Sequence, residues 1–460
     1  MTLRFLLALW FGKKARVLTR FLGRGSGSAL PGLVALKIDP TFLQRGLQNL
    51  PKGFVVISGT NGKTTTTHMT YAALKASYLS VITNAEGSNL LRGIASAIIE
   101  KSSWIGNLNA EIGVFEVDEA TLPLLVRMTP PRILVLLNLF RDQLDRYGEV
   151  EKVQKNWADA LLRLPKTTTL ILNADDPLVA SLPAGKSKKT FFGIDDREVG
   201  HAEAPSHLDI RNCPSCGKKL LMTSFFAAHL SHYRCSSCSF QRPRPEIAAE
   251  NIVDKHLEST TMTFQASGLS HRVTIPLPGL PAAYGALATL CVSSVLGIPI
   301  ADTIASIETL TRPFGRWETL TIGNQNILLV LIKNPAGASA VLETLESESL
   351  ETLLLALNDN IADGTDVSWI WDAPFEQLPK AKQVIVTGTR ADDLALRLKY
   401  AEKTVTVIPN LSRAVEEGQS KEGSLTVLAT YTAMLDIRKI LVGTKIPKCS
   451  GSIIPEVLGI

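Results

Sequence analysis

One glycine-rich loop limits the fold of this chain more than any other feature of its sequence. Residues 53–58, GFVVIS, form a short β-branched run, and GTNGKTTTT follows it before a helical stretch through Ala76. In a strand–loop–helix unit of this kind, backbone N–H groups and the helix amino end face a phosphate, while the lysine reaches the outer phosphates. The first hydroxyl after the lysine is available to Mg²⁺. We therefore predict a nucleotide site formed by Gly59, Thr60, Asn61, Gly62, Lys63, Thr64 and Thr65.

The context of this loop decides its assignment, because its spacing is unusual. Ile57 and Ser58 stand where the common G-x-x-x-x-G-K-[ST] form begins, so the loop is a shorter variant. A glycine turn with a chance lysine is the alternative. It does not account for a strand, a turn, Lys-Thr and a helix in this order.

Apolar runs that alternate with helix-like segments extend this unit along the chain. They predict the α/β class with a mostly parallel, doubly wound sheet. A second α/β unit follows, with NILLVLI, TLLLALN, QVIVTG, TVTVIP and LTVLAT as its strands. At 460 residues, of which 45% are hydrophobic and 20% charged, the chain can bury more than one core. We predict a basic helix and linker over 1–34, a nucleotide-binding domain over 35–311 and a second domain over 312–460.

The first stretch of the chain is basic and carries no acid. Its apolar run of about ten residues is too short to span a bilayer. Two interpretations stay open: a helix packed on its own domain with a solvated basic face, or a basic aromatic helix on an anionic membrane surface. The basic residues are Arg4, Lys13, Lys14, Arg16, Arg20 and Arg24.

Four of the six cysteines form two C-x-x-C pairs in a Pro-rich island at about 205–245. Cys213, Cys216, Cys235 and Cys238 have zinc-ribbon spacing, and four thiolates leave no open position, so the predicted Zn²⁺ is structural. His229 lies between the pairs and is expected to be an ordinary histidine rather than a ligand. This cysteine usage indicates a reduced compartment, so we expect a cytoplasmic protein, at the inner membrane face if the basic helix meets lipid.

Acidic side chains follow the predicted strand in VFEVDE. Mg²⁺ prefers carboxylates, and open parallel sheets bind ligands at the carboxyl ends of their strands. Glu116 is therefore the first choice for Mg²⁺, ahead of Asp118 and Glu119, although an ordinary acidic helix start is the alternative. Weaker candidates, for contacts with a substrate, are Asn84, Asn138, Arg141 and Asp142.

These motifs together resemble the Mur ligase superfamily. They are GTNGKTT, FEVDEATLP, NLFRDQLDRYGE, LNADDP and FGRWE. The cysteine insertion, KNPAG and LNDNIADGTDVSWIWD make the chain similar to the MurT type, the ligase-like subunit of lipid II isoglutaminyl synthase, from about residue 35 to 440. The resemblance implies a Mur ligase central domain with a zinc-ribbon insertion and a Rossmann-like C-terminal domain. It also implies ATP-dependent amidation, through an acyl phosphate, of the D-glutamate α-carboxylate in the lipid II stem peptide.

The resemblance also implies roles for single residues. It assigns phosphate and Mg²⁺ to Lys63 and Thr64, Mg²⁺ to Glu116, and an approach to the nucleotide to Arg316. Two departures leave the adenine contacts and a second metal site open. GLPAAYGALA stands in place of an Asn-bearing F-N-x-Y-N segment, and Gln143 stands in place of the histidine of a D-H-L-D motif.

The second unit lacks the residues of a glutaminase. All seven histidines occur at or before His271, and the two cysteines outside the pairs lie in an apolar helical run and in PKCSG. A glutaminase needs a cysteine activated by a histidine, so a partner of the GatD type would supply both and release the ammonia. The resemblance assigns the acid that orients this histidine to Asp366, with Trp369 and Trp371 as interface anchors. An aspartate that caps a turn is the alternative.

Two other functions stay open at this level. One is a stand-alone ligase of the Mur or folylpolyglutamate type, which adds a whole amino acid. The other is a zinc-ribbon ATPase that binds nucleic acid with salt-sensitive affinity. A net charge of only +5 disfavours the second, so we predict no nucleic-acid partner.

Overall fold

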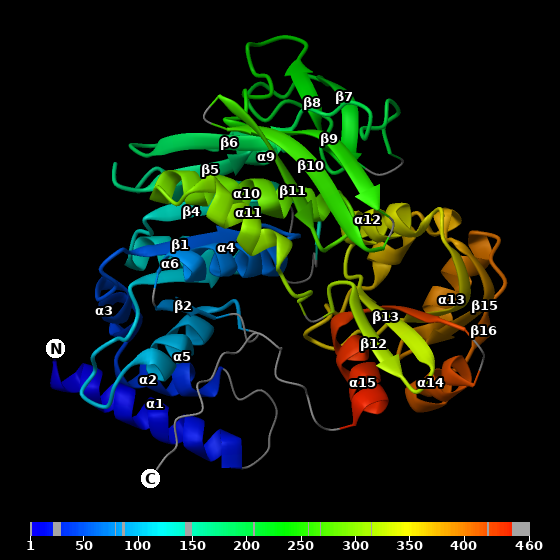
Figure 1. The fold of residues 1–460 in the computed structure, drawn as a ribbon, viewed down its shortest axis with the longest axis horizontal. Helices are drawn as coiled ribbons and strands as arrows, with labels where there is room; N and C mark the ends of the chain where they lie inside the picture. The colour runs from blue at the N-terminus through cyan, green and yellow to red at the C-terminus, as the bar shows by residue number, and fades with distance from the viewer. Residues whose placement is uncertain are drawn as a thin grey trace.

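The computed structural model describes residues 2–21, 29–78, 80–84, 88–142, 150–205, 208–255, 257–266, 268–313, 315–420 and 423–443. Within them, two α/β sheets form two lobes, and a small two-stranded hairpin packs on the lobe of the larger sheet (Figure 1). The predicted α/β class is confirmed.

The larger sheet has nine strands in the order β11-β10-β9-β6-β5-β4-β1-β3-β2. From β9 to β2 all neighbours are parallel, whereas β10 and β11 add an antiparallel edge. Parallel strands are covered on both faces, which explains their continuous apolar runs. The strands are β1 Phe54–Ser58, β2 Val81–Thr83, β3 Ile112–Glu116, β4 Ile133–Leu136, β5 Thr169–Asn173, β6 Lys188–Ile194, β9 Ile247–Lys255, β10 Ser259–Ala266 and β11 Leu269–Ile275.

Helices cover both faces of this sheet because successive strand residues point to opposite sides. Val55 and Ile57 pack into a core with α4 and α10, while Phe54 and Val56 pack into a second core with α1, α3 and α5. The helices of this lobe are α1 Leu3–Phe21, α2 Leu30–Ile38, α3 Phe42–Gln48, α4 Lys63–Ser77, α5 Leu91–Lys101, α6 Leu122–Met128, α8 Val150–Leu161, α9 Pro177–Ala180, α10 Leu280–Leu296 and α11 Ile300–Glu308.

The first helix packs on its own domain, as one of the two interpretations expects. Phe5 is buried and stacks on Phe42 with ring centroids 4.7 Å apart, and Leu9 is fully buried. Beside it, α2 touches α5 so closely that a Cβ on Gly32 would lie 1.9 Å from the carbonyl oxygen of Arg92. None of the helices in the described residues is both long and apolar enough to cross a membrane.

The second sheet has six strands in the order β12-β13-β17-β14-β15-β16, parallel except for β12. α12 and α13 pack on one face, α14 and α15 on the other. The change of sheet between β11 and β12 agrees with the domain limit at 311/312, which stays a prediction. The elements are β12 Glu318–Ile322, β13 Gln325–Leu331, α12 Pro335–Leu345, β14 Ser349–Ala356, β15 Lys380–Thr387, α13 Ala391–Tyr400, β16 Thr406–Val407, α14 Leu411–Gln419, β17 Leu425–Ala429 and α15 Tyr431–Val442, with short 3-10 helices at Ser368–Trp371 and Phe375–Gln377.

Substituting Gly32 tests the close contact of α2 with α5. We expect Gly32→Ala to lower the free energy of unfolding by about 3 kcal/mol, because the new methyl group collides with backbone atoms that cannot move independently. Gly323→Ala is the control, since nothing lies within 4 Å of its Cβ and only its positive φ adds strain, about 1 kcal/mol. Urea unfolding followed by circular dichroism measures both. Equal losses would contradict the packing argument.

Candidate active site

The predicted phosphate loop lies at the carboxyl end of β1 and leads into α4, which begins at Lys63. Gly62 has φ of 84°, a left-handed conformation that favours glycine. A Cβ on Gly59 would lie 3.0–3.1 Å from backbone atoms of Asn138 on the adjoining strand end. The loop therefore needs glycine at both positions, once for its turn and once for its close contact with β4.

Asn138, which follows β4, fastens the loop. Its Oδ1 accepts a hydrogen bond from the Asn61 N–H at 2.8 Å, and its Nδ2 donates to the Asn61 carbonyl at 3.1 Å. The Thr60 N–H donates to the Asn138 carbonyl at 3.0 Å. Asn138 thus positions the loop backbone, and its predicted contact with a substrate stays a prediction.

Lys63 is buried among acceptors. Its Nζ donates to the Gly59 carbonyl at 2.5 Å and to Glu119 Oε2 at 3.0 Å. Burial alone would lower the pKa of Lys63, but Glu119, Glu116 and Asp142 outweigh it, so the pKa is raised and the ammonium stays charged. Sequence reasoning named the lysine and missed its pairing with Glu119.

Glu116, at the end of β3, lies among cationic groups. Its charge opposes the lowering effect of burial on two pKa values: that of Lys63 is raised overall, whereas burial still leaves that of Arg316 lowered. Asn84 holds its backbone, because Asn84 Oδ1 accepts from the Glu116 N–H at 3.0 Å and Asn84 Nδ2 donates to the Glu116 carbonyl at 2.8 Å. Asn84 therefore supports β3.

The other two acids of VFEVDE have different surroundings. Asp118 Oδ1 accepts from the Ala120 N–H at 3.1 Å, which is a turn-capping contact, and Glu119 pairs with Lys63. The preference for Glu116 as a metal ligand stays a prediction. Thr64, the predicted hydroxyl ligand, follows Lys63 and is half-buried.

The KNPAG segment of the second domain meets the phosphate loop directly. The side-chain amides of Asn61 and Asn334 exchange two hydrogen bonds, at 3.1 and 3.2 Å. Next to them, Lys333 Nζ donates to Asp142 Oδ2 at 2.7 Å. Asn334 Oδ1 also accepts from the Gly337 N–H at 2.7 Å and so caps α12. The beginning of α12 is thereby locked to the loop of the first domain.

A third contact between the domains joins Arg141 to Asp372 as an ion pair. Asp372 also lines a small cavity of about 70 Å³, together with Asp209 and Ala228 of the first domain and Glu343 of the second. Arg141 and Asp142, predicted as substrate contacts, both pair with side chains of the second domain. A larger cavity, about 350 Å³, lies at the amino ends of β1 and β4, away from the loop.

The four aspartates of LNDNIADGTDVSWIWD have four different partners. Asp359 pairs with Arg390, Asp363 binds Thr432 and Asp372 pairs with Arg141. Asp366 Oδ1 accepts from the Ser368 N–H at 2.8 Å and caps the short helix that follows. Within the described residues this is the one hydrogen bond of its carboxylate. Asp366 therefore makes the turn-capping contact that the alternative interpretation expects. Its Oδ2 remains available for a further hydrogen bond.

Aromatic side chains beside this loop reach the surface. Trp371 is 48% exposed and packs edge-on against Tyr400, which is 71% exposed, with ring centroids 5.6 Å apart. Trp369 is instead half-buried against the core of the second domain. Of the two predicted anchors, only Trp371 is strongly exposed.

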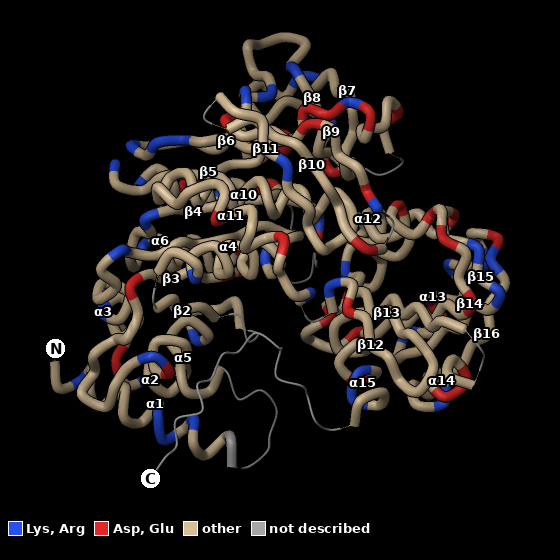
Figure 2. Tube along the Cα trace, viewed as in Figure 1, with Lys and Arg blue, Asp and Glu red and all other residues tan. Residues whose placement is uncertain are grey.

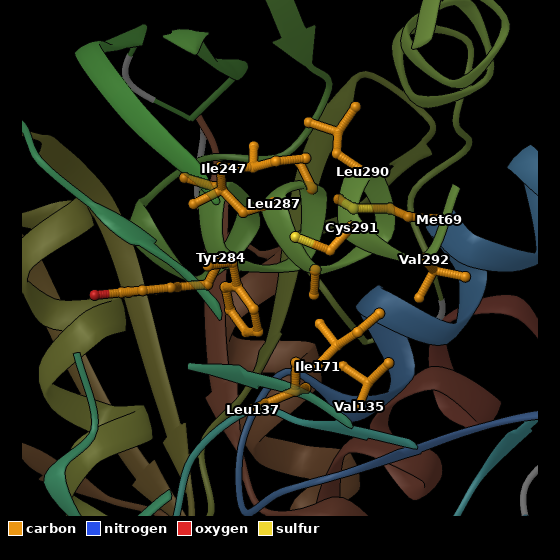
Figure 3. Close-up of a cluster of buried hydrophobic side chains, with 14 of the residues drawn as sticks. Met69, Val135, Leu137, Ile171, Ile247, Tyr284, Leu287, Leu290, Cys291 and Val292 are labelled. Atoms are coloured by element: carbon orange, nitrogen blue, oxygen red, sulfur yellow. The ribbon is translucent and has the colours of Figure 1, made fainter. Parts of the chain in front are cut away.

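The GLPAAYGALA segment, residues 279–288, stands where the family pattern has asparagine, and in this structure it forms the packed beginning of α10. Tyr284 on α10 donates through its hydroxyl to Asp175 Oδ2 at 2.9 Å, and a Cβ on Gly285 would lie 3.2 Å from Thr66 Oγ1 on α4. Cys291 lies further along the same helix within the core shown in Figure 3, where burial raises the pKa of its thiol. An inert, buried thiol agrees with the expectation that Cys291 is no nucleophile.

The four cysteines of the two pairs converge at the base of the β7 Leu220–Ala227 and β8 Leu230–Cys235 hairpin. Their Sγ atoms all lie within 4.8 Å of one another and form no disulfide. Two separations, 3.7 Å for Cys213–Cys238 and 3.4 Å for Cys216–Cys235, approach the roughly 3.8 Å edge of a tetrahedron with 2.3 Å zinc–sulfur bonds. The donor set and its spacing fit a tetrahedral metal ion.

His229, at the tip of this hairpin, is fully buried between two carboxylates. Its Nε2 lies 3.4 Å from Asp176 Oδ2 and its Nδ1 lies 3.7 Å from Asp209 Oδ2. Burial lowers its pKa, but both carboxylates oppose this, and the result is a pKa raised to about 9. The same oxygens accept from the N–H groups of Leu139 and Arg141, at 2.8 and 3.0 Å. The insertion thus holds the segment that carries Arg141.

Comparisons with known proteins agree with this arrangement. The Mur ligase middle domain model matches residues 57–212, and the MurT ligase C-terminal model matches residues 331–434. The lipid II isoglutaminyl synthase (glutamine-hydrolyzing) subunit MurT of Streptococcus pneumoniae is 35% identical over 97% of this chain and 99% of its own.

Solved structures share the fold at lower identity. A pseudomurein peptide ligase type C from Methanothermus fervidus superimposes with a TM-score of 0.66 at 21% identity, over 86% of this chain and 79% of its own. MurF ligase from Thermotoga maritima, in complex with ADP, gives 0.61 at 16% identity over 89% and 83% of the two chains.

A phosphate loop on a parallel sheet, followed by a second α/β domain that contacts the loop, defines a protein with the Mur ligase fold. Within that class, the match over nearly the full length of both chains identifies the family. The chain belongs to the MurT family.

The buried histidine predicts a pH dependence of stability. Because the folded pKa of His229 lies near 9 and the unfolded value near 6.5, its stabilising contribution is complete below about 6.5 and is lost as the pH rises through 9. The loss is on the order of 3 kcal/mol. Thermal unfolding between these pH values should show this decline in the wild type and a flatter profile in His229→Gln. His232→Gln, in the same hairpin, is the control and should keep the wild-type slope.

Proposed function

We propose that this chain is the ligase subunit of a lipid II isoglutaminyl synthase, which converts the D-glutamate α-carboxylate of the stem peptide into an amide. The observation that carries the proposal is the end-to-end match with the S. pneumoniae subunit of that name. The contacts of Lys63 at the carboxyl end of β1, and the influence of Glu116 on its charge, support it. ATP and Mg²⁺ are the cofactors that the fold implies.

Lys63, Thr64, Glu116 and Arg316 are the residues that would act on the γ-phosphoryl group. A carboxylate oxygen of the substrate attacks phosphorus, ADP leaves, and Lys63 exchanges its contact with Glu119 for the phosphate charge. Mg²⁺ would be held by Thr64 and Glu116 and would neutralise phosphate charge. Ammonia then attacks the acyl carbon, inorganic phosphate leaves, and the nitrogen loses a proton to give the amide.

The contacts between the domains have a role in this chemistry. An acyl phosphate is lost to hydrolysis unless water is excluded. The Asn61–Asn334 and Lys333–Asp142 pairs hold α12 against the loop, so the second domain forms one wall of the reaction site. Arg141, paired with Asp372, lies at the same junction and is a weaker candidate for binding the substrate.

The ammonia would come from a glutaminase partner of the GatD type. The available oxygen of Asp366 supports the idea that this residue orients the partner's histidine. Exposed Trp371 and Tyr400, with Ile361 at 89% exposure, offer an apolar surface on the same domain for the partner.

Three further parts of the proposal concern architecture. The four cysteines hold a structural Zn²⁺ within an insertion at about 205–245. The domains divide at 311/312 after a basic segment over 1–34. The protein works at the cytoplasmic face of the membrane, where a lipid-anchored substrate is presented, and the outer surface of α1 supports this location.

Amide formation on a lipid II-type substrate tests the proposal. With Mg²⁺-ATP, the chain alone should use free ammonium, and it should use glutamine only when the glutaminase subunit is present. Addition of a whole amino acid by the chain alone would favour a stand-alone ligase instead. Glutamine use without a partner would also contradict the proposal.

Asp366→Asn separates the two nitrogen sources. We expect it to reduce the glutamine-dependent rate by roughly 10³-fold or more while leaving the ammonium-dependent rate unchanged, because only the partner's histidine loses its acid. Asp359→Asn, in the same loop but paired with Arg390, is the matched control and should affect neither route. Equal losses on both routes would assign Asp366 to local structure alone.

Glu116→Gln tests the metal assignment. If Glu116 binds Mg²⁺, its substitution should raise the Mg²⁺ concentration for half-maximal activity by about 10- to 100-fold on both routes. Asp118→Asn is the control, because Asp118 Oδ1 caps a turn by accepting a hydrogen bond from the Ala120 N–H. An unchanged Mg²⁺ titration for Glu116→Gln would move the metal site to another acid.

A further inference from the structure

Helix α1 has a second apolar face that the fold leaves uncovered. Its inner face, with Phe5 and Leu9, is buried against α2 and α3. The outer residues recur at helical spacing and remain exposed: Leu3 72%, Leu7 37%, Trp10 42%, Phe11 50%, Val17 64% and Leu18 57%. Contiguous apolar exposure of this kind on a folded domain marks an interaction site.

A loop far away in the sequence joins this face. Trp104 and Ile105, between α5 and β3, are 57% and 71% exposed. The Trp10 Nε1–H donates to the Trp104 carbonyl at 2.7 Å, and Lys13 Nζ donates to the Ser102 carbonyl at 2.6 Å. These bonds fix the loop beside the helix, so the outer face of α1 and the loop at 104–105 form one continuous patch, named here the α1–Trp104 surface.

The charge around this surface is mainly positive. Residues 1–38 contain no Asp or Glu, and Figure 2 shows basic residues along α1 without an acid. Arg4, Lys13, Lys14 and Arg16 flank the apolar residues, and the nearby Glu100 is paired with Arg16. Lys13 Nζ lies 5.3 Å from the centroid of the Trp104 ring, which places a cation and an indole at the same level of the surface.

We propose that the α1–Trp104 surface binds an anionic phospholipid bilayer. Tryptophan favours the headgroup level, aliphatic side chains enter the acyl boundary, and lysine and arginine attract anionic lipids. A protein interface would more commonly be depleted of lysine at its centre. The other proposed interaction surface, beside Asp366, belongs to the second domain, and the β7–β8 hairpin lies at the opposite end of the molecule (Figure 1).

This inference deepens the proposed function, on which it rests for its purpose, since a substrate with a lipid anchor is reached only at a membrane. The binding itself requires neither ATP nor the substrate. Vesicles without lipid II therefore separate the two proposals.

The experiment is flotation of the full chain with vesicles of phosphatidylcholine, with and without phosphatidylglycerol. We expect binding to the anionic vesicles, weakened by salt, with a blue shift of tryptophan fluorescence. The triple variant Leu3→Ser/Val17→Ser/Ile105→Ser should bind at least about tenfold more weakly. Lys14→Gln should bind about fivefold more weakly. The control is Leu124→Ser/Leu162→Ser/Leu269→Ser, which alters three exposed apolar residues elsewhere and should bind like the wild type.

Each outcome decides the inference. Equal binding by the two triple variants, or no binding to anionic vesicles, would overturn it. A change in solution mass in the first triple variant, without vesicle binding by the wild type, would assign the surface to a protein partner or a second copy. Vesicle binding without amidation would retain the surface and reject the proposed function. Amidation of a water-soluble stem peptide without vesicle binding would retain the proposed function and reject the membrane-binding surface.

Discussion

A buried ammonium group is the constraint on which the candidate site depends. Removing a lysine from water is costly unless acceptors and opposite charges replace its hydration. Lys63 donates hydrogen bonds to a loop carbonyl and to Glu119. The charges of Glu116 and Asp142 also raise its pKa. Glu116, which we propose as the Mg²⁺ ligand, is thus also one of the acids that keep the lysine charged before phosphate binds.

The same charge balance links the two domains. Asp142 stabilises Lys63 and also accepts a hydrogen bond from Lys333 of the second domain. Glu116 similarly acts on both Lys63 and Arg316. A nucleotide that neutralises Lys63 would alter both relations together. Phosphate binding would therefore act on the contacts of the second domain through these carboxylates.

The sequence predicted what is local and missed what depends on topology. The strand, glycine turn and helix around Lys63 are contiguous in the sequence, and each C-x-x-C pair is also a short local motif. Residue types at fixed spacing were therefore sufficient to predict both features. The Asn61–Asn334 pair joins residues 273 positions apart, and no periodicity indicates it. Glu119 rather than Glu116 meets Lys63 because of the direction in which the chain leaves β3, which a run of acids does not reveal. The loop from Asp359 to Asp372 shows the same limit, since four similar residues have four different partners.

The cysteine insertion affects the site through packing rather than chemistry. Its own core is small, with Cys213, Leu220 and Tyr233 among its few buried residues, so a metal ion would supply much of its stability. The tip of its hairpin places His229 between Asp176 and Asp209, whose oxygens also hold the N–H groups of Leu139 and Arg141. Loosening the insertion would leave two buried carboxylates facing each other without a cation. That repulsion would act on the backbone before Arg141, so a metal ion held by the four cysteines would influence the junction between the domains through His229.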